Sequence, residues 1–385
     1  MVRLLVDQGV LDGSARALPL AWLQGFDVAA YPARRLGEWL GSDPAQAMLL
    51  RSVTRLTAAE LERLPQLRAV ATLSSGTDHI EEPALAARGI ALHTGRGGNA
   101  AAVAQWTEWA LARLLGPGRG PVPVPVPVPA PVRDPVPVPA PVPAPVPARD
   151  PARDPARDPA RDPAADWLRQ RRILVVGVGA VGTVVARRLK QLGATVLLCD
   201  PPRAEREPGF ASLALDAALA TGLDALTVHV PLTLAGQHAT ANLLNDKRIN
   251  LLRGAVLLDA ARGGVLDEGA AVVARRDGLL RGLALDTFAG EPQPRPEVLA
   301  AADLATPHIA GHTVEGKLRV AALAVGGLRS AFGLGPVDVD AAIRKQLEQL
   351  QPPQAFAALD AAHAALRAGA AFDAVRHGHL RSEAR

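Results

Sequence analysis

The stretch RILVVGVGAVG, residues 172–182, decides the fold of this protein. Its first half predicts a buried strand, its second half is a G-x-G-x-x-G pattern, and a helical pattern follows. This order is typical of a dinucleotide-binding βαβ unit, because the glycines allow a tight turn, close approach of pyrophosphate and close packing of the helix. The phosphates then meet free amides at the helix N-terminus. The residues predicted to bind the cofactor are Gly177, Gly179, Ala180, Val181 and Gly182.

A carboxylate follows at the position where the ribose of the cofactor is expected. Asp200 comes directly after the apolar run TVLLC (195–199) and about 20 residues after the glycine pattern, the spacing of the acid that bonds the ribose hydroxyls. A carboxylate repels a 2′-phosphate, so we expect NAD rather than NADP. A glycine turn without a ligand is the alternative interpretation, but strand, helix and acid together favour dinucleotide binding.

Further apolar runs predict a doubly wound parallel sheet. LDALTVHVPL (223–232), GAVLLDAARGGVL (254–266) and RGLALDTF (281–288) are strand candidates separated by helical patterns. Residues 1–99 also alternate short strands and helices, and residues 99–115 form a long apolar helical run that ends at a Gly-Pro-Gly stop signal.

We therefore predict an α/β fold with two domains. A doubly wound parallel Rossmann NAD domain covers residues 100–312, and a smaller flavodoxin-like α/β substrate domain covers residues 1–99. A returning helix over 313–335 completes the substrate domain. Residues 336–385 are expected to form a short helical tail.

A Pro-rich, low-complexity insert is predicted over residues 117–165. Pro alternates with Val or Ala over 121–148 and PARD repeats follow, which removes backbone donors and favours polyproline II over helix or sheet. A docking site for a proline-recognising partner is one interpretation. We favour a repeat that expanded in a tolerant surface loop.

Composition narrows the class of protein further. The 385 residues carry a net charge of only +4, with the many Arg residues spread along the chain, so a nucleic-acid partner is not expected. The single cysteine, Cys199, excludes a disulfide framework within the chain and a thiolate zinc site, and no metal is expected. No run of 18 apolar residues is present, so no membrane span is expected, and we expect a cytoplasmic protein.

Three segments that each follow a strand candidate carry the chemistry. Arg262, Glu291 and His308 lie in DAARGG (259–264), LDTFAGEP (285–292) and TPHIAG (306–311). Oxidation of a 2-hydroxy acid needs a base for the hydroxyl proton, an acid that orients this base, and a cation for the carboxylate; His, Glu and Arg supply these. Each residue alone is as well explained by a turn, a cap or a loop, but their joint occurrence in this order predicts catalysis.

These segments resemble the signatures of the D-2-hydroxyacid dehydrogenases, and further motifs resemble the erythronate-4-phosphate dehydrogenase branch of that family. The resemblance covers residues 1–116 and 167–330. The motifs that carry it are RSVTR (51–55), GTDH (76–79), NA (99–100), CDPPR (199–203), PHIAG (307–311) and EGKLR (315–319). The resemblance implies NAD-dependent oxidation of 4-phospho-D-erythronate to 3-hydroxy-2-oxo-4-phosphooxybutanoate, a step of pyridoxal-phosphate biosynthesis.

The resemblance also implies roles for individual residues. Arg262 and Glu291 are active-site residues, and His308 is the proton donor or acceptor. Substrate contacts are implied for Ser52, Ser74 and His312. Contacts with NAD are implied for Asp200, Val230, Ala260, Ala261, Arg262, Asp286 and Gly311.

The chain departs from the family pattern at several positions. His312 replaces a tyrosine, Asp259 an asparagine, Val230 a frequent threonine, and Gly98 a cysteine. Asp259 adds a negative charge near Arg262, which we expect to weaken carboxylate binding. The family also has a C-terminal dimerisation domain, of which the tail 336–385 resembles a remnant, so a homodimer is implied but weakened.

Two alternative functions remain open at this point. Another 2-hydroxy acid, such as 3-phosphoglycerate or glycerate, is the alternative substrate. A non-catalytic NAD-binding regulator is favoured by the Pro-rich insert and disfavoured by the presence of Arg262, Glu291 and His308.

Overall fold

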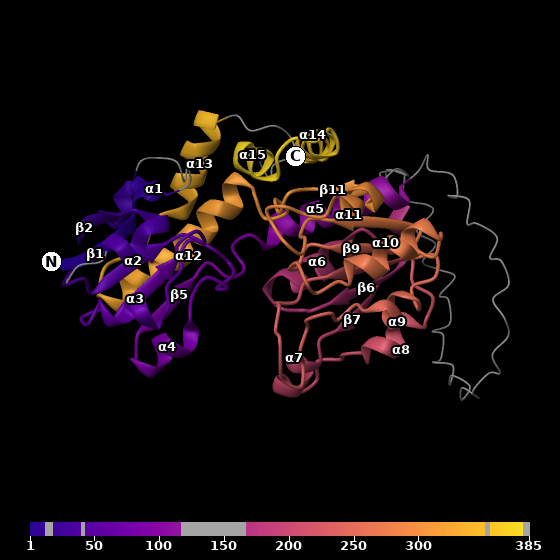
Figure 1. Cartoon of the computed structure of the whole chain (residues 1–385), viewed down its shortest axis with the longest axis horizontal. Helices are drawn as coiled ribbons and strands as arrows, with labels where there is room; N and C mark the ends of the chain where they lie inside the picture. Colours follow the sequence, from indigo (N-terminus) through magenta and orange to yellow (C-terminus); the bar gives the residue numbers. More distant parts are fainter. Residues whose placement is uncertain (12–17, 40–42, 117–166, 351–354, 380–385) are drawn as a thin grey trace, which may run out of the picture.

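The computed structural model describes residues 1–11, 18–39, 43–116, 167–350 and 355–379. The predicted Pro-rich insert lies outside the described residues. The described chain forms two parallel β-sheets, each flanked by helices, side by side along the long axis of the molecule (Figure 1). No helix among the described residues is both long and apolar enough to cross a membrane.

The first sheet is built from the N-terminal part of the chain and has the strand order β2-β1-β3-β4-β5. All its pairs are parallel, and this order is that of flavodoxin-like folds. Its strands are β1 (Val2–Asp7), β2 (Phe26–Tyr31), β3 (Ala47–Leu50), β4 (Ala69–Thr72) and β5 (Ala91–Thr94). The short helices that connect them are α1 (Gln8–Leu11), α2 (Leu36–Trp39), α3 (Ala58–Glu62) and α4 (Glu82–Ala87).

A helix from the far end of the chain covers one face of this sheet. Helix α12 (Val314–Ala331) packs against β4 and β5, and its buried residues share a core with alternate residues of β1, β3 and β4. The other face of the sheet packs on a separate cluster. Gly95 and Gly98 allow the chain to leave this sheet close to α12, because a Cβ on either residue would lie within 2.9 Å of backbone atoms of Val320.

The second sheet has the strand order β11-β10-β9-β8-β6-β7, again all parallel. Its strands are β6 (Arg172–Val176), β7 (Thr195–Cys199), β8 (Ala225–Val228), β9 (Val256–Asp259), β10 (Gly282–Leu285) and β11 (Leu304–Ala305). The helices are α5 (Ala100–Leu115), α6 (Ala180–Gln191), α7 (Pro201–Arg206), α8 (Leu215–Leu219), α9 (Asp246–Ile249), α10 (Glu268–Arg276) and α11 (Pro296–Ala301).

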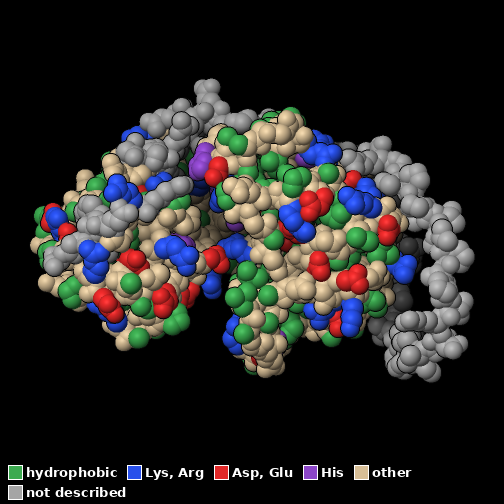
Figure 2. Space-filling view, in the orientation of Figure 1, with side chains coloured by type: hydrophobic (Ala, Val, Ile, Leu, Met, Phe, Trp, Pro, Cys, Tyr) green, Lys and Arg blue, Asp and Glu red, His purple; other side chains and the backbone are tan. Residues whose placement is uncertain are grey.

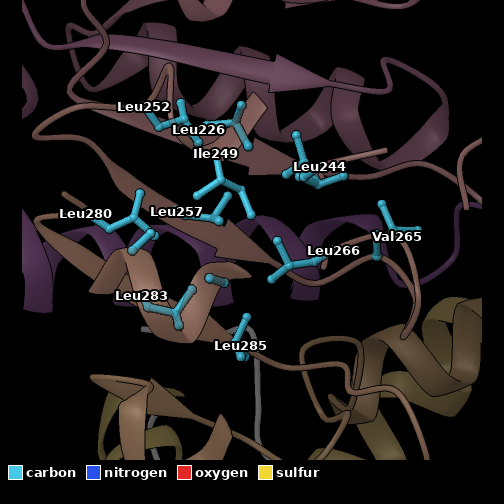
Figure 3. Close-up of a cluster of buried hydrophobic side chains, with 14 of the residues drawn as sticks. Leu226, Leu244, Ile249, Leu252, Leu257, Val265, Leu266, Leu280, Leu283 and Leu285 are labelled. Atoms are coloured by element: carbon cyan, nitrogen blue, oxygen red, sulfur yellow. The ribbon is translucent and has the colours of Figure 1, made fainter. Parts of the chain in front are cut away.

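Both faces of the second sheet are buried, which explains the nearly continuous apolar strands. Alternate strand residues point into two hydrophobic clusters, one shown in Figure 3 and one on the α5 and α6 side. The strand order reverses between β7 and β8 at β6, and ligands of such sheets bind at the carboxyl ends of strands near this switch. The predicted α/β fold, with a doubly wound sheet and a flavodoxin-like sheet, is confirmed.

The C-terminal residues form three helices, α13 (Val339–Leu350), α14 (Ala355–Arg367) and α15 (Phe372–Gly378). Helix α13 packs on α12, beside the first sheet. Helix α14 packs on α5 and β11, so the chain returns to the second sheet after α13 (Figure 1).

Candidate active site

The glycine turn between β6 and α6 has the geometry that pyrophosphate binding requires. Gly177 has φ +82°, a left-handed conformation that favours glycine. A Cβ on Gly182 would lie 1.9 Å from the carbonyl oxygen of Gly177, so helix and strand approach too closely for any side chain. A Cβ on Gly179 would meet nothing within 4 Å, so space remains beside the N-terminus of α6. The turn therefore fits a dinucleotide phosphate group.

Asp200 and Arg203 clamp the residue in the middle of this turn. Asp200 Oδ2 accepts a hydrogen bond from the backbone N–H of Val178 (2.7 Å), and Arg203 Nη1 donates to the Val178 carbonyl (2.8 Å). Asp200 also caps helix α7, because its Oδ1 accepts from the N–H of Arg203 (2.9 Å). The predicted ribose carboxylate therefore lies against the phosphate turn.

A cavity of about 390 Å³ opens beside this clamp. Its lining includes Val178, Gly179, Ala180 and Thr183 from the turn and α6, and Arg203 and Arg206 from α7. The cavity lies beside the glycine turn that follows β6, at the edge of the sheet where dinucleotide-binding folds hold their ligand.

The second and third glycines of this turn predict different effects of a substitution by alanine. Gly179→Ala should leave the melting temperature of the free protein unchanged, because the new methyl group meets open space, but should weaken NAD binding about tenfold or more by filling that space. Gly182→Ala should lower the melting temperature itself through the clash with Gly177. Calorimetry with and without NAD measures both. Equal loss of stability in the two variants would contradict this geometry.

The three predicted catalytic residues follow three neighbouring strands of the second sheet. Arg262 follows β9, Glu291 follows β10, and His308 follows β11. The loops carrying the first two approach closely, because a Cβ on Gly263 would lie 2.1 Å from the carbonyl oxygen of Phe288. The carboxyl ends of adjacent parallel strands thus bring these residues to one edge of the sheet.

His308 and Glu291 form a hydrogen-bonded pair. Nδ1 of His308 lies 2.8 Å from Oε2 of Glu291, and the second carboxylate oxygen accepts from the backbone N–H of Phe288 (2.9 Å). Burial favours the neutral acid, but the hydrogen bond and charge of His308 outweigh it, so the pKa of Glu291 is lowered. An ionised Glu291 requires a proton on Nδ1 of His308, which leaves Nε2 of the neutral ring as the proton acceptor.

The loop that carries His308 is held by the buried carboxylate of Asp286. Its Oδ1 accepts from the Thr306 hydroxyl (2.6 Å) and the Ile309 N–H (2.8 Å), and its Oδ2 accepts from the Ala310 N–H (2.9 Å). The backbone carbonyl of Asp286 accepts from the His308 N–H (2.7 Å). His308 has φ +54°, which is rare for a residue with a side chain and is maintained by these bonds. Asp286 therefore shapes the loop that carries His308, and its predicted contact with NAD stays a prediction.

Arg262 reaches across to the first sheet. Its Nε lies 3.3 Å from Oδ2 of Asp78, in the loop after β4, and its Nη1 donates to the carbonyl of Ala261 (2.8 Å). A Cβ on Gly76 would lie 2.1 Å from Nη2 of Arg262, so the guanidinium rests on this glycine. Figure 2 shows charged side chains on both sides of the notch between the two halves. Asp78 is part of the GTDH motif, but nothing in the sequence indicated that it pairs with Arg262.

The predicted substrate residues lie at the carboxyl ends of strands or in the adjoining turns. Ser52 is exposed and is the second residue after β3, and Ser74 is the second residue after β4 and donates to the Gly76 carbonyl (2.7 Å). His312 lies in the turn before α12. Its backbone N–H donates to the carbonyl of Ile309 (2.9 Å), so it belongs to the same turn system as His308.

The remaining residues predicted to contact NAD lie close to the glycine turn or the catalytic loops. Val230 borders the turn, because a Cβ on Gly177 would lie 2.7 Å from its side chain. Ala260 and Ala261 directly follow β9. Gly311 packs on the side chain of Asn99, which accepts a hydrogen bond from Ser75 (3.0 Å). These contacts with NAD stay predictions.

Asp259 is buried at the end of β9. Burial raises its pKa to about 7, although hydrogen bonds from the Ala261 N–H and the Thr287 hydroxyl oppose the shift. The carboxyl is therefore largely neutral below this pH. At neutral pH Asp259 is therefore only partly ionised, and it adds less negative charge near Arg262 than the sequence suggested.

The raised pKa predicts a pH-dependent effect of Asp259→Asn. An acid with a folded-state pKa of about 7 contributes stability below its unfolded pKa of about 4, and this contribution is lost as the pH rises through about 7. Asparagine can keep the bond from Ala261 without ionising. We expect the variant to exceed the wild-type free energy of unfolding by about 1–3 kcal/mol at pH 8, and by less at pH 5. Denaturant titrations measure this, and a gain that does not depend on pH would contradict it.

Comparisons with known proteins agree with this geometry. Residues 153–310 match the family model "D-isomer specific 2-hydroxyacid dehydrogenase, NAD binding domain". The chain is 34% identical over 296 residues to an erythronate-4-phosphate dehydrogenase of Escherichia coli O81 (strain ED1a), and 33% identical to one of Shigella boydii serotype 4. Each match covers 76% of this chain and 65% of the relative, so the chain spans less than two thirds of the length of these proteins.

Solved structures of similar fold include a protein from Thermus thermophilus, with a TM-score of 0.59 and 26% identity over 88% of this chain and 99% of that one. An NADPH-dependent glyoxylate/hydroxypyruvate reductase of Sinorhizobium meliloti matches with a TM-score of 0.62 and 22% sequence identity. This match covers 88% of this chain and 98% of that chain. At 22% identity the second match supports the fold alone. The sequence relatives, the family model and the glycine turn agree with one another. The chain is similar to the D-isomer-specific 2-hydroxyacid dehydrogenases, and the segment that matches their NAD-binding domain, residues 153–310, contains every strand of the second sheet.

Proposed function

We propose that this protein oxidises the C2 hydroxyl of a phosphorylated D-2-hydroxy acid with NAD, and that 4-phospho-D-erythronate is its substrate. The single observation that carries the reaction type is the His308–Glu291 pair, 2.8 Å apart, at the strand edge that also presents Arg262. The choice of substrate is supported by the similarity to erythronate-4-phosphate dehydrogenases. The product would be 3-hydroxy-2-oxo-4-phosphooxybutanoate, for pyridoxal-phosphate biosynthesis in the cytoplasm.

The residues divide the chemistry between them. Nε2 of His308 takes the hydroxyl proton, and Glu291 stabilises the imidazolium that results. Arg262 binds the substrate carboxylate in place of Asp78, so that C2 and its hydrogen are oriented. NAD held at the glycine turn between β6 and α6 would supply the acceptor for the C2 hydrogen, which leaves as hydride. The C2–O bond becomes a carbonyl as the proton and the hydride leave.

We assign the substrate phosphate to Arg51 at the first sheet. The Arg51 guanidinium donates to both carboxylate oxygens of Asp7 (2.8 and 2.9 Å), and Asp7 is fully buried. Asp7 is the last residue of β1 and Arg51 directly follows β3, and the strand order reverses between these two strands. The pair therefore holds a planar, permanently charged group at the point where such sheets bind ligands. Ser52 is the next residue in this loop.

Formation of NADH with 4-phospho-D-erythronate tests the proposal. We expect a higher kcat/KM for this acid than for 3-phosphoglycerate or glycerate. A preference for an unphosphorylated acid would exclude the proposed substrate but keep the reaction type. Absence of turnover with every 2-hydroxy acid would exclude the enzyme and favour an NAD-binding regulator.

Replacement of the proposed base tests the mechanism separately. His308→Gln should lower kcat about 10²- to 10⁴-fold, because glutamine cannot take up the hydroxyl proton. The variant should still bind NAD, and the rise of its melting temperature at saturating NAD measures this binding. A variant that retains wild-type turnover would show that another group accepts the proton.

Homodimer formation is part of the same proposal and is supported only by resemblance to the family. Light scattering that gives twice the mass of one chain would support it. The mass of a single chain would exclude it.

A further inference from the structure

We propose that helices α14 and α15 position the two catalytic loops, and that His363 is the positioning residue for the loop that carries His308. The inference rests on the proposed function, because it assigns these helices a part in that reaction. Two separate contacts carry it, one to each loop.

The first contact joins α14 to the strand that leads into the loop. Nδ1 of His363 lies 3.1 Å from the backbone nitrogen and 3.3 Å from the carbonyl oxygen of Ala305, the last residue of β11, and in its unprotonated form it accepts a hydrogen bond from the Ala305 N–H. β11 is the edge strand of the sheet, with β10 as its only neighbour in the described sheet, so this N–H has a side-chain partner instead of another strand. Only an unprotonated Nδ1 can accept here, and burial lowers the pKa of His363.

The contact continues directly into the catalytic loop. Thr306, the next residue, accepts from the indole N–H of Trp106 (2.8 Å) and donates to Asp286 (2.6 Å). His308 follows two residues later with its left-handed backbone. His363 and Trp106 thus fix the entry of the loop from one side, while Asp286 fixes it from within.

The second contact joins α15 to the loop that carries Glu291. The ring of Phe372 packs edge-on against Phe288, with centroids 6.0 Å apart and planes at 83°. The backbone N–H of Phe288 is the donor to Glu291 Oε1. The positive charge of Arg376, also on α15, contributes to the lowered pKa of Glu291. The C-terminal helices therefore contact the supports of both members of the His308–Glu291 pair.

General stabilisation by these helices is a separate effect that the test must exclude. Leu359 and Leu366 of α14 and Phe372 of α15 are buried in the core clusters of the second sheet, so damage to either helix lowers stability. Arg367 provides a matched control on the same helix. It donates to the carbonyls of Leu299 and Ala300 (2.8 and 3.2 Å), near the end of α11 and away from the catalytic loop.

The experiment compares His363→Leu, His363→Asn and Arg367→Ala in the full chain. We expect His363→Leu to lower kcat about ten- to hundredfold with little change in the affinity for NAD, because a misplaced base affects the reaction rather than cofactor binding. Asparagine can still accept from Ala305, so His363→Asn should recover kcat to within a few-fold. Arg367→Ala should lower the melting temperature and leave kcat unchanged.

Amide hydrogen exchange of residues 305–310 gives a second readout that does not require turnover. Exchange there should accelerate in His363→Leu and not in Arg367→Ala. Equal exchange and equal kcat in these two variants would overturn the positioning role. Failure of the wild-type protein to oxidise any 2-hydroxy acid would instead overturn the proposed function, while the exchange comparison would still decide whether α14 holds the loop.

Discussion

The buried carboxylate of Asp286 is the constraint on which the rest of the candidate site depends. It binds one hydroxyl and two backbone N–H groups of the loop 306–310, and this loop has the left-handed residue His308 at its centre. Burial raises the pKa of Asp286, opposed by the charge of His308 and by these hydrogen bonds. A network of this kind is favourable only when its members are all bonded, so the loop has a single arrangement that satisfies it.

Close contacts at glycine residues are a second feature of this structure. Gly182 approaches Gly177 in the cofactor turn, Gly263 approaches Phe288 between two catalytic loops, and Gly76 lies under Arg262. A side chain at any of these glycines would clash with the neighbouring atoms, and each glycine follows the carboxyl end of a strand. The same residues that shape the turns therefore bring Arg262, Glu291 and the cofactor turn to one edge.

Much of this arrangement could be predicted from the sequence, because strand, glycine turn and acid have fixed spacings in such folds. The apolar runs placed β6 to β10 correctly, and Asp200 lies at the end of β7 as expected. Contacts between distant segments could not be predicted. The pairing of Arg262 with Asp78 joins residues 184 positions apart, and the bond from Ala305 to His363 depends on how α14 returns to the sheet. No periodicity or motif encodes such contacts. The pKa of Asp259 likewise depends on burial that only the folded chain defines.

We propose that this edge of the sheet removes the hydroxyl proton and the C2 hydride of a 2-hydroxy acid. The most direct test is incubation of the protein with NAD and 4-phospho-D-erythronate deuterated at C2, followed by mass spectrometry of the nicotinamide. We expect the deuterium to be recovered on the reduced cofactor. Cofactor that binds the folded protein but acquires no deuterium from this acid, or from any other C2-deuterated 2-hydroxy acid, would contradict it.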